Sequence, residues 1–181
     1  MELEQALESI RPASEQAMEQ AGAHWNDLAL PLHSLGRLQD TVVRIAGMTR
    51  TPQVTLGKKA LVVMCADNGV VEEGVTQSGQ EVTRIVAENF LQEKATAAIL
   101  CKKAGGIAAD SKIINRKIAY GTKNMAKEPA MTRQEVKKAL EVGIAMAEEL
   151  KEKGYGIIAT GEMGIGNTTT SSAVTSVLLE E

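Results

Sequence analysis

Three closely spaced glycines, Gly161, Gly164 and Gly166, lie within the stretch TGEMGIGNTTTSSAV at residues 160–174. A turn between a parallel strand and a helix leaves several backbone N–H groups without partners, and these lie at the positive end of the helix dipole. Glycine lets such a backbone approach phosphate oxygens closely and adopt positive φ. The stretch therefore predicts a phosphate site. The alternative is a glycine-rich turn that is needed only for tight packing between strand and helix.

The residues beside the glycines separate this motif from better-known phosphate loops. Asn167 stands where a Walker A loop has lysine, and the spacing is not GxGxxG. Asn167 and Thr168–Thr170 add amide and hydroxyl donors to the turn. Glu162 would repel a phosphate, so we expect it to hold a ribose hydroxyl or a cationic ring slightly farther away. The alternative for Glu162 is a solvated surface glutamate.

Two apolar runs, residues 59–67 and 155–160, have the length and β-branched content of buried parallel strands. The first run ends in Asp67 and Asn68, at the end of the strand where open α/β sheets place their ligands. Helical periodicity predicts the helices 3–22, 34–47, 80–103, 132–153 and 168–179. The alternation of strands and helices predicts an α/β fold with a parallel sheet.

Local signals refine three of these helices. Pro12 interrupts the first, which predicts either two short helices or one kinked helix. Ser34 is a possible N-cap for the second. Thr132 and Glu135 have the spacing of a capping box, in which each side chain accepts a hydrogen bond from the other residue's backbone. In the helix 80–103, the apolar residues expected to face inward include Ile85 and Leu100.

The composition excludes several classes of function. The chain has 181 residues, 44% of them hydrophobic, a net charge of −3 and 2% aromatic residues, so a nucleic-acid partner is not expected. No apolar run is long enough for a membrane span, and the first residues lack the apolar segment of a signal peptide. Cys65 and Cys101 are expected to be buried thiols in a reducing cytoplasm. The two histidines are too few for a histidine-based metal site, and we expect no metal.

Four stretches together resemble one enzyme family, the nicotinate-nucleotide–dimethylbenzimidazole phosphoribosyltransferases. GEMGIGNTT resembles the family signature, and the resemblance spans nearly the whole chain in the family's order. The other stretches are LPLHSLGRLQD (30–40), CADNGVVEEGVTQSGQEVT (65–83) and INRKIAYGTKNMAKEPAMT (114–132). The resemblance implies transfer of phosphoribose from nicotinate mononucleotide to 5,6-dimethylbenzimidazole during cobalamin assembly, without a cofactor.

The resemblance also implies an architecture. We expect a doubly wound, mostly parallel, Rossmann-like sheet with a small helical subdomain. Residues 1–50 would supply N-terminal helices of that subdomain, and residues 51–181 would form the first part of the α/β phosphoribosyltransferase domain. The family's C-terminal half has no counterpart here, so we expect the sequence to be part of a longer protein or a degenerate relative. The resemblance further implies a cytoplasmic homodimer.

Family positions carried onto this sequence give roles to particular residues. Glu162 is the catalytic candidate, close to the ribose and the reacting centre. Ser78 would line the benzimidazole pocket, with Asp67 and Asn68 nearby. Met163 would pack on the flat base, or else simply fill the core. The backbone expected to hold the 5′-phosphate is that of Gly164, Ile165, Gly166, Asn167 and Thr168.

Departures from the family pattern leave other functions open. The family's main catalytic base lies in the half that has no counterpart here. Asn68 stands where histidine is usual, and asparagine does not titrate. KKAGGIAADSK (102–112) passes through a place where the family has a short strand. The alternatives are a non-catalytic module that binds a nucleotide or an α-riboside, and an unrelated phosphate-binding α/β protein.

Overall fold

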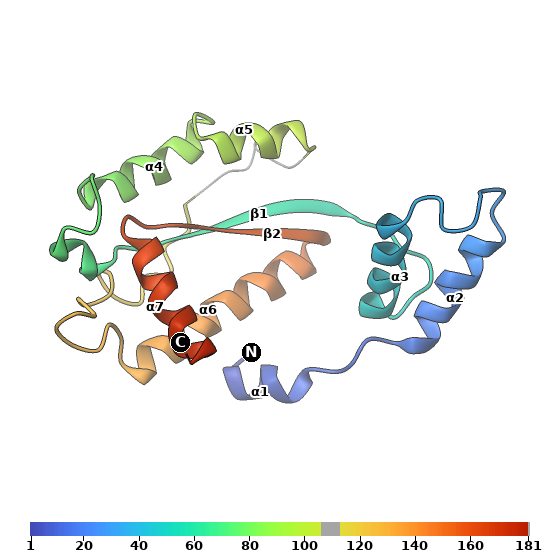
Figure 1. Ribbon diagram of the computed structural model, residues 1–181, viewed down its shortest axis with the longest axis horizontal. Coiled ribbons are helices and arrows are strands. Elements are labelled where there is room, and N and C mark those ends of the chain that lie inside the picture. The colour runs from blue at the N-terminus through green and yellow to red at the C-terminus, as the bar shows by residue number, and fades with distance from the viewer. Residues whose placement is uncertain (106–112, 181) are drawn as a thin grey trace. The chain divides into compact units, whose positions relative to one another are not determined.

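The computed structural model describes residues 1–105 and 113–180, and its elements are shown in Figure 1. The segment 102–112, where the family resemblance implies a missing strand, lies mostly outside these residues. The chain forms two compact units, one of Glu4–Leu56 and the other of Met1–Leu3 with Gly57–Glu181. The domain boundary expected after residue 50 stays a prediction. All the residues expected at the site belong to the unit that contains the strands.

The elements of the first unit are the helices α1 (Leu3–Ser9), α2 (Glu15–Asn26) and α3 (Arg37–Thr49). Pro12 lies between α1 and α2, so two short helices form rather than one kinked helix. Helices α2 and α3 approach closely because small residues meet between them. Ala21 and Ala46 are buried, and a Cβ on Gly47 would overlap the side chain of Met18.

The N-cap expected for α3 is wrong. The helix begins at Arg37, and its N-cap is Gly36, which has a φ of 48°. The Ser34 N–H donates to the Pro31 carbonyl at 3.0 Å. Ser34 therefore belongs to a turn that precedes the helix, and glycine provides the positive φ through which the chain enters it.

The second unit is built on two parallel strands, β1 (Lys58–Cys65) and β2 (Tyr155–Met163). The two apolar runs form these strands as predicted, with Val63 opposite Gly161 and Cys65 opposite Met163. The helices of this unit are η1 (Gly69–Glu73, a 3-10 helix), α4 (Glu81–Leu91), α5 (Thr96–Lys103), α6 (Arg133–Glu152) and α7 (Asn167–Leu179). Figure 1 shows α4 and α5 on one side of the strand pair and α6 on the other. Because the strands are parallel, the segments that follow them lie side by side.

The single helix predicted over residues 80–103 is wrong, because the structure has two helices there. Helix α4 ends at Leu91, and Glu93 has a φ of 54° in the left-handed region. The chain then re-enters a helix at Thr96. Two residues expected to face inward are instead exposed: Ile85 by 43% and Leu100 by 60%.

Helix α6 follows the predicted capping box. The Thr132 Oγ1 accepts from the Glu135 N–H at 3.2 Å, and the Glu135 carboxylate accepts from the Thr132 N–H at 2.7 Å. Hydrogen bonds from the Thr132 backbone and side chain lower the pKa of the Glu135 carboxyl. Gly154, with a φ of 79°, ends this segment and leads into β2. The capping box is therefore confirmed, and it sets the start of the helix that precedes β2.

The strands are less buried than predicted. Apolar side chains that are more than nine-tenths buried in the described residues are all small, namely Ala17, Ala21, Ala46, Val70 and Ala98. Met64 in β1 and Ile158 in β2 are exposed by 41% and 37%. Cys65 is exposed and Cys101 half-buried, so the prediction of two buried thiols is wrong. No helix of the described ranges combines the length and apolarity needed to cross a bilayer.

Candidate active site at the carboxyl ends of the strands

The glycine turn connects the end of β2 to the start of α7. Gly166 is the N-cap of α7 and has a φ of 85°, a conformation that favours glycine. A Cβ at Gly166 would lie 2.9 Å from the Val71 Cγ2, and one at Gly164 would overlap the Ala66 carbonyl oxygen. Gly166 is therefore needed for its backbone conformation, and both glycines are needed for close approach to the segment after β1.

The hydrogen bonds of the turn show which amides a ligand could use. The Ile165 N–H donates to the Thr83 Oγ1 at 3.0 Å, and the Asn167 N–H donates to the Gly164 carbonyl at 3.0 Å. Among the described residues, the N–H groups of Gly164, Gly166 and Thr168 have no acceptor. The expectation that the backbone amides of Ile165 and Asn167 donate to phosphate needs correction, because the Thr83 hydroxyl and the Gly164 carbonyl already accept from them.

Two buried side chains hold this turn from the neighbouring segments. Asn68, 8% exposed, donates through Nδ2 to the Ile165 carbonyl at 3.0 Å. Its Oδ1 lies 3.3 Å from the Thr170 Oγ1, which shares its one proton between this oxygen and the Asn167 carbonyl at 2.9 Å. Thr83, 5% exposed, lies on α4 and accepts from the Ile165 N–H. Thr83 was not predicted as a site residue, and its only signal in the sequence is that it is a polar residue within the apolar pattern of a helix.

Glu162 lies at the end of β2 and is exposed. Its carboxylate accepts a hydrogen bond from the Asn167 Nδ2, which fixes it beside the turn. Desolvation of the thiol and, second, the charge of Glu162 raise the pKa of Cys65 on the neighbouring strand. Glu162 and Cys65 therefore lie near each other at the carboxyl ends of the two strands.

The loop after β1 brings Asp67 to this end of the sheet. Its Oδ1 accepts from the Gln80 Nε2 at 2.9 Å, and its carbonyl accepts from the Thr122 N–H at 3.0 Å. Ser78 is exposed, and its carbonyl accepts from the Thr76 Oγ1 at 2.5 Å. No bond joins Ser78 to the glycine turn within the described part of the chain. The structure therefore ties Asp67 to Gln80 and Thr122 and leaves Ser78 exposed, two residues before Gln80.

One buried amide and several exposed charged side chains join η1 to residues 122–127. Asn124, 7% exposed, donates to the Glu73 carboxylate at 2.6 Å. The Lys127 ammonium lies 3.1 Å from the Glu72 carboxylate and 3.3 Å from that of Glu73. The hydrogen bond from Lys127 lowers the pKa of Glu72, and that from Asn124 lowers the pKa of Glu73. This cluster holds the loop after β1 against the loop that contacts Asp67.

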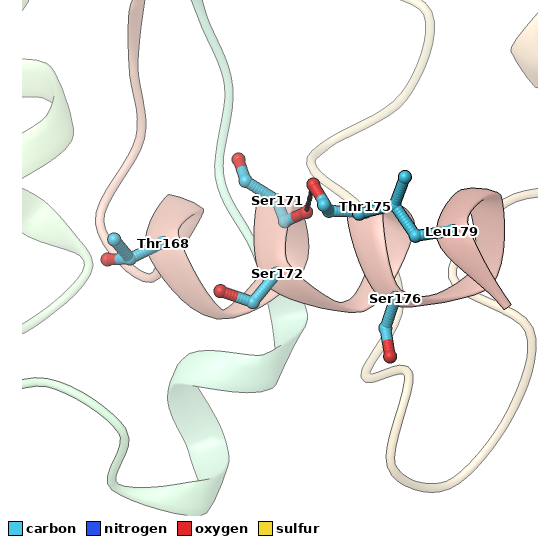
Figure 2. A pocket seen from close by; sticks show the side chains of 6 residues that line it. All are labelled: Thr168, Ser171, Ser172, Thr175, Ser176 and Leu179. Atoms are coloured by element: carbon cyan, nitrogen blue, oxygen red, sulfur yellow. Dashed lines mark hydrogen bonds between the residues drawn. The ribbon is translucent and has the colours of Figure 1, made fainter. Parts of the chain in front are cut away.

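A shallow hollow of about 400 Å³ continues from the turn along α7. Figure 2 shows its side chains on successive turns of the helix, with Thr168 at the end nearest the glycine turn. Its lining is Thr168, Ser171, Ser172, Thr175, Ser176 and Leu179. The Thr175 Oγ1 donates to the Ser171 carbonyl at 2.8 Å. The surface beside the free amides is therefore rich in hydroxyl groups.

Comparison with known proteins places this geometry in a family. The family model described as phosphoribosyltransferase matches residues 10–181. The chain belongs to this phosphoribosyltransferase family. Among curated members, the nicotinate-nucleotide–dimethylbenzimidazole phosphoribosyltransferase of Clostridium tetani is 45% identical over an alignment of 187 positions, gaps included, that covers 97% of this chain and 52% of the relative. The enzyme of the same name from Acetivibrio thermocellus is 44% identical, with 97% and 53% covered.

A solved phosphoribosyltransferase structure confirms the fold. The crystal structure of CobT from Thermus thermophilus matches with a TM-score of 0.82 and 35% identity. The match covers 91% of this chain and 53% of CobT. The resemblance seen in the four sequence stretches and the α/β fold with a parallel sheet are therefore confirmed. The chain spans about half the length of the curated relatives it matches.

Proposed function

We propose that this chain contributes the nucleotide-binding part of a nicotinate-nucleotide–dimethylbenzimidazole phosphoribosyltransferase. The observation that carries the proposal is the set of amides at Gly164, Gly166 and Thr168, which have no acceptor in the described residues at the start of a 13-residue helix. A helix N-terminus favours an anion by about 0.3–1 kcal/mol in exposed sites and by about 2 kcal/mol in sheltered ones. Both named curated relatives carry out this transfer according to their names.

In the proposed reaction, the bond between C1′ of the ribose and the pyridine nitrogen breaks, and its electron pair leaves with nicotinate. The lone pair of one benzimidazole nitrogen forms the new bond to C1′. The proton on the other benzimidazole nitrogen passes to a base. The products are α-ribazole 5′-phosphate and nicotinate. The amides of the turn hold the 5′-phosphate, so much of the acceleration comes from orientation of C1′.

The side chains have separate roles in this proposal. Glu162, fixed by Asn167, lies near the ribose and the reacting centre, where its negative charge stabilises positive charge that develops on the sugar. Asp67, Ser78 and Met163 are proposed to border the benzimidazole. The roles of these four residues rest on the family resemblance and on their place at the ends of the strands. A cytoplasmic location and a homodimeric assembly are likewise proposed from the resemblance.

Binding of nicotinate mononucleotide by the purified chain, measured by titration calorimetry, tests the phosphate site. Gly166→Asp places a carboxylate beside the free amides, and we expect binding at least ~10-fold weaker, equal to about 1.4 kcal/mol. Gly74→Asp is the matched control, because Gly74 also has a positive φ of 69° but lies in open space. Equal affinities in the two variants would remove the phosphate site from the glycine turn.

Release of nicotinate from nicotinate mononucleotide and dimethylbenzimidazole tests the reaction itself. We expect Glu162→Gln to lower turnover more than affinity, because the charge acts mainly on the transition state. A loss confined to affinity would make Glu162 only a substrate-holding residue. Binding of the nucleotide without any release of nicotinate would instead support a non-catalytic binding module.

A further inference from the structure

The backbone of Ile165 is held at both of its polar atoms by buried side chains from different segments. Thr83 of α4 accepts from its N–H at 3.0 Å. Asn68, which follows β1, donates to its carbonyl at 3.0 Å. Thr83 is 5% exposed and Asn68 is 8% exposed. Ile165 is thus fixed by residues 82 and 97 positions away in the sequence.

These two bonds determine where the neighbouring amides point. A peptide unit is planar and trans, so its C=O and N–H point in opposite directions. The Ile165 carbonyl shares its peptide unit with the Gly166 N–H. When Asn68 holds that carbonyl, the Gly166 N–H must point away from Asn68. In the preceding peptide unit, the Ile165 N–H points to Thr83, and the Gly164 carbonyl faces the opposite way and accepts from the Asn167 N–H at 3.0 Å.

We propose that Asn68 and Thr83 are positioning residues that aim the Gly166 amide at the phosphate without contacting the ligand themselves. This inference rests on the proposed function. It gives a positioning role to the two buried polar side chains that hold the backbone of the proposed phosphate site. A glycine-flanked turn has many accessible conformations, and ordering one residue costs about 1–2 kcal/mol. The two side-chain bonds offset this cost before any ligand arrives, so the amides are preorganised.

The chemistry of Asn68 fits this task. Its side chain donates to the Ile165 carbonyl and, at the same time, accepts from the Thr170 Oγ1 at 3.3 Å. An amide offers a donor and an acceptor at once, whereas a carboxylate at this position could not donate to the Ile165 carbonyl. Asn68 therefore connects the glycine turn to the first turn of α7.

Substitutions of Thr83 separate positioning from general packing. Thr83→Val keeps the shape but removes the acceptor, and we expect nicotinate mononucleotide to bind about 10-fold more weakly. Thr83→Ser keeps the hydroxyl, and we expect it to restore binding to within about 3-fold of the original protein. Thr41→Val is the control, since the Thr41 hydroxyl bonds only within α3. Equal affinity of the Val and Ser variants at position 83 would overturn the proposal.

Hydrogen exchange of the Ile165 amide, followed by NMR, tests the bonds without any ligand. We expect exchange at Ile165 to be slow in the original protein and at least ~10-fold faster in Thr83→Val, while exchange at Val63 in β1 stays unchanged. Fast exchange in the original protein would overturn the proposal. If the original protein binds no nucleotide but Ile165 exchanges slowly, the proposed function fails and the turn is held for packing alone. If Thr83→Val exchanges faster yet binds nucleotide normally, the function stands and the positioning role is wrong.

Discussion

Replacement of Gly166 by alanine tests whether the glycine turn is as constrained as the structure indicates. A residue other than glycine at a φ of 85° costs about 1–2 kcal/mol. The new Cβ would also lie 2.9 Å from the Val71 Cγ2, which must move by several tenths of an ångström. That contact adds about 1 kcal/mol. An unfolded chain with alanine at this position has less conformational entropy than one with glycine, and this difference offsets about 0.4–1 kcal/mol of the two costs. We therefore expect Gly166→Ala to lower the free energy of unfolding by about 1–2.5 kcal/mol.

Substitutions of two further glycines in the same unit separate the cost of the backbone conformation from the cost of the contact with Val71. Gly74 has a φ of 69° but no atom near an added Cβ, so Gly74→Ala carries only the backbone cost. We expect it to lower the free energy of unfolding by at most about 1.5 kcal/mol, and by about 1 kcal/mol less than Gly166→Ala. Gly143 lies within α6 in open space, so Gly143→Ala should stabilise the unit by up to about 1 kcal/mol.

Urea titration followed by circular dichroism at 222 nm measures all three variants under the same conditions. The expected order of stability places Gly143→Ala highest, then the original protein, then Gly74→Ala, then Gly166→Ala. If Gly166→Ala is as stable as Gly74→Ala, the segment after β1 does not press against the turn. If it is as stable as Gly143→Ala, the left-handed conformation at Gly166 is itself wrong.

Three other predictions concern stability. Thr132→Ala removes the capping box of α6 and should lower the free energy of unfolding by about 1 kcal/mol in a urea titration. Leu178→Glu, at a side chain that is 77% exposed, should change the free energy of unfolding by less than about 0.5 kcal/mol in the same titration. The lowered pKa values of Glu72 and Glu73 mean that their contribution is present above about pH 4.5 and is lost as the pH falls through the folded pKa values. Lys127→Met should therefore flatten the loss of stability between neutral and acidic pH in thermal unfolding scans, and an unchanged pH profile would contradict the role of this cluster.

Elements with strong local signals could be predicted from the sequence. The capping box at Thr132 depends on groups only three residues apart. A proline such as Pro12 breaks a helix when it lies in the helix interior. The break between α4 and α5 has no such signal, since it contains neither glycine nor proline. Glu93 adopts a positive φ there, and only tertiary context selects that conformation for a glutamate.

Burial could not be predicted in the same way. The apolar pattern of a strand or helix shows which side chains can be buried, but burial also needs another element to cover them. Leu100 and Ile158 follow the apolar pattern of their segments and are nonetheless exposed by 60% and 37%. The fully covered positions are instead those where segments come close together, as at Val70 beside the glycine turn.

Asn68 shows how far residue type can lead toward a site. Its position after a strand correctly placed it at the carboxyl end of the sheet, but the expectation that it contacts substrate does not fit its bonds. Its amide is used within the protein, at the Ile165 carbonyl and the Thr170 hydroxyl, and it is 8% exposed. Both partners are about 100 residues away in the sequence, so no local pattern could reveal them. Hydrogen bonds from buried side chains to a glycine-rich backbone thus decide which amides remain for a ligand, and these bonds exist only once the two strands have paired.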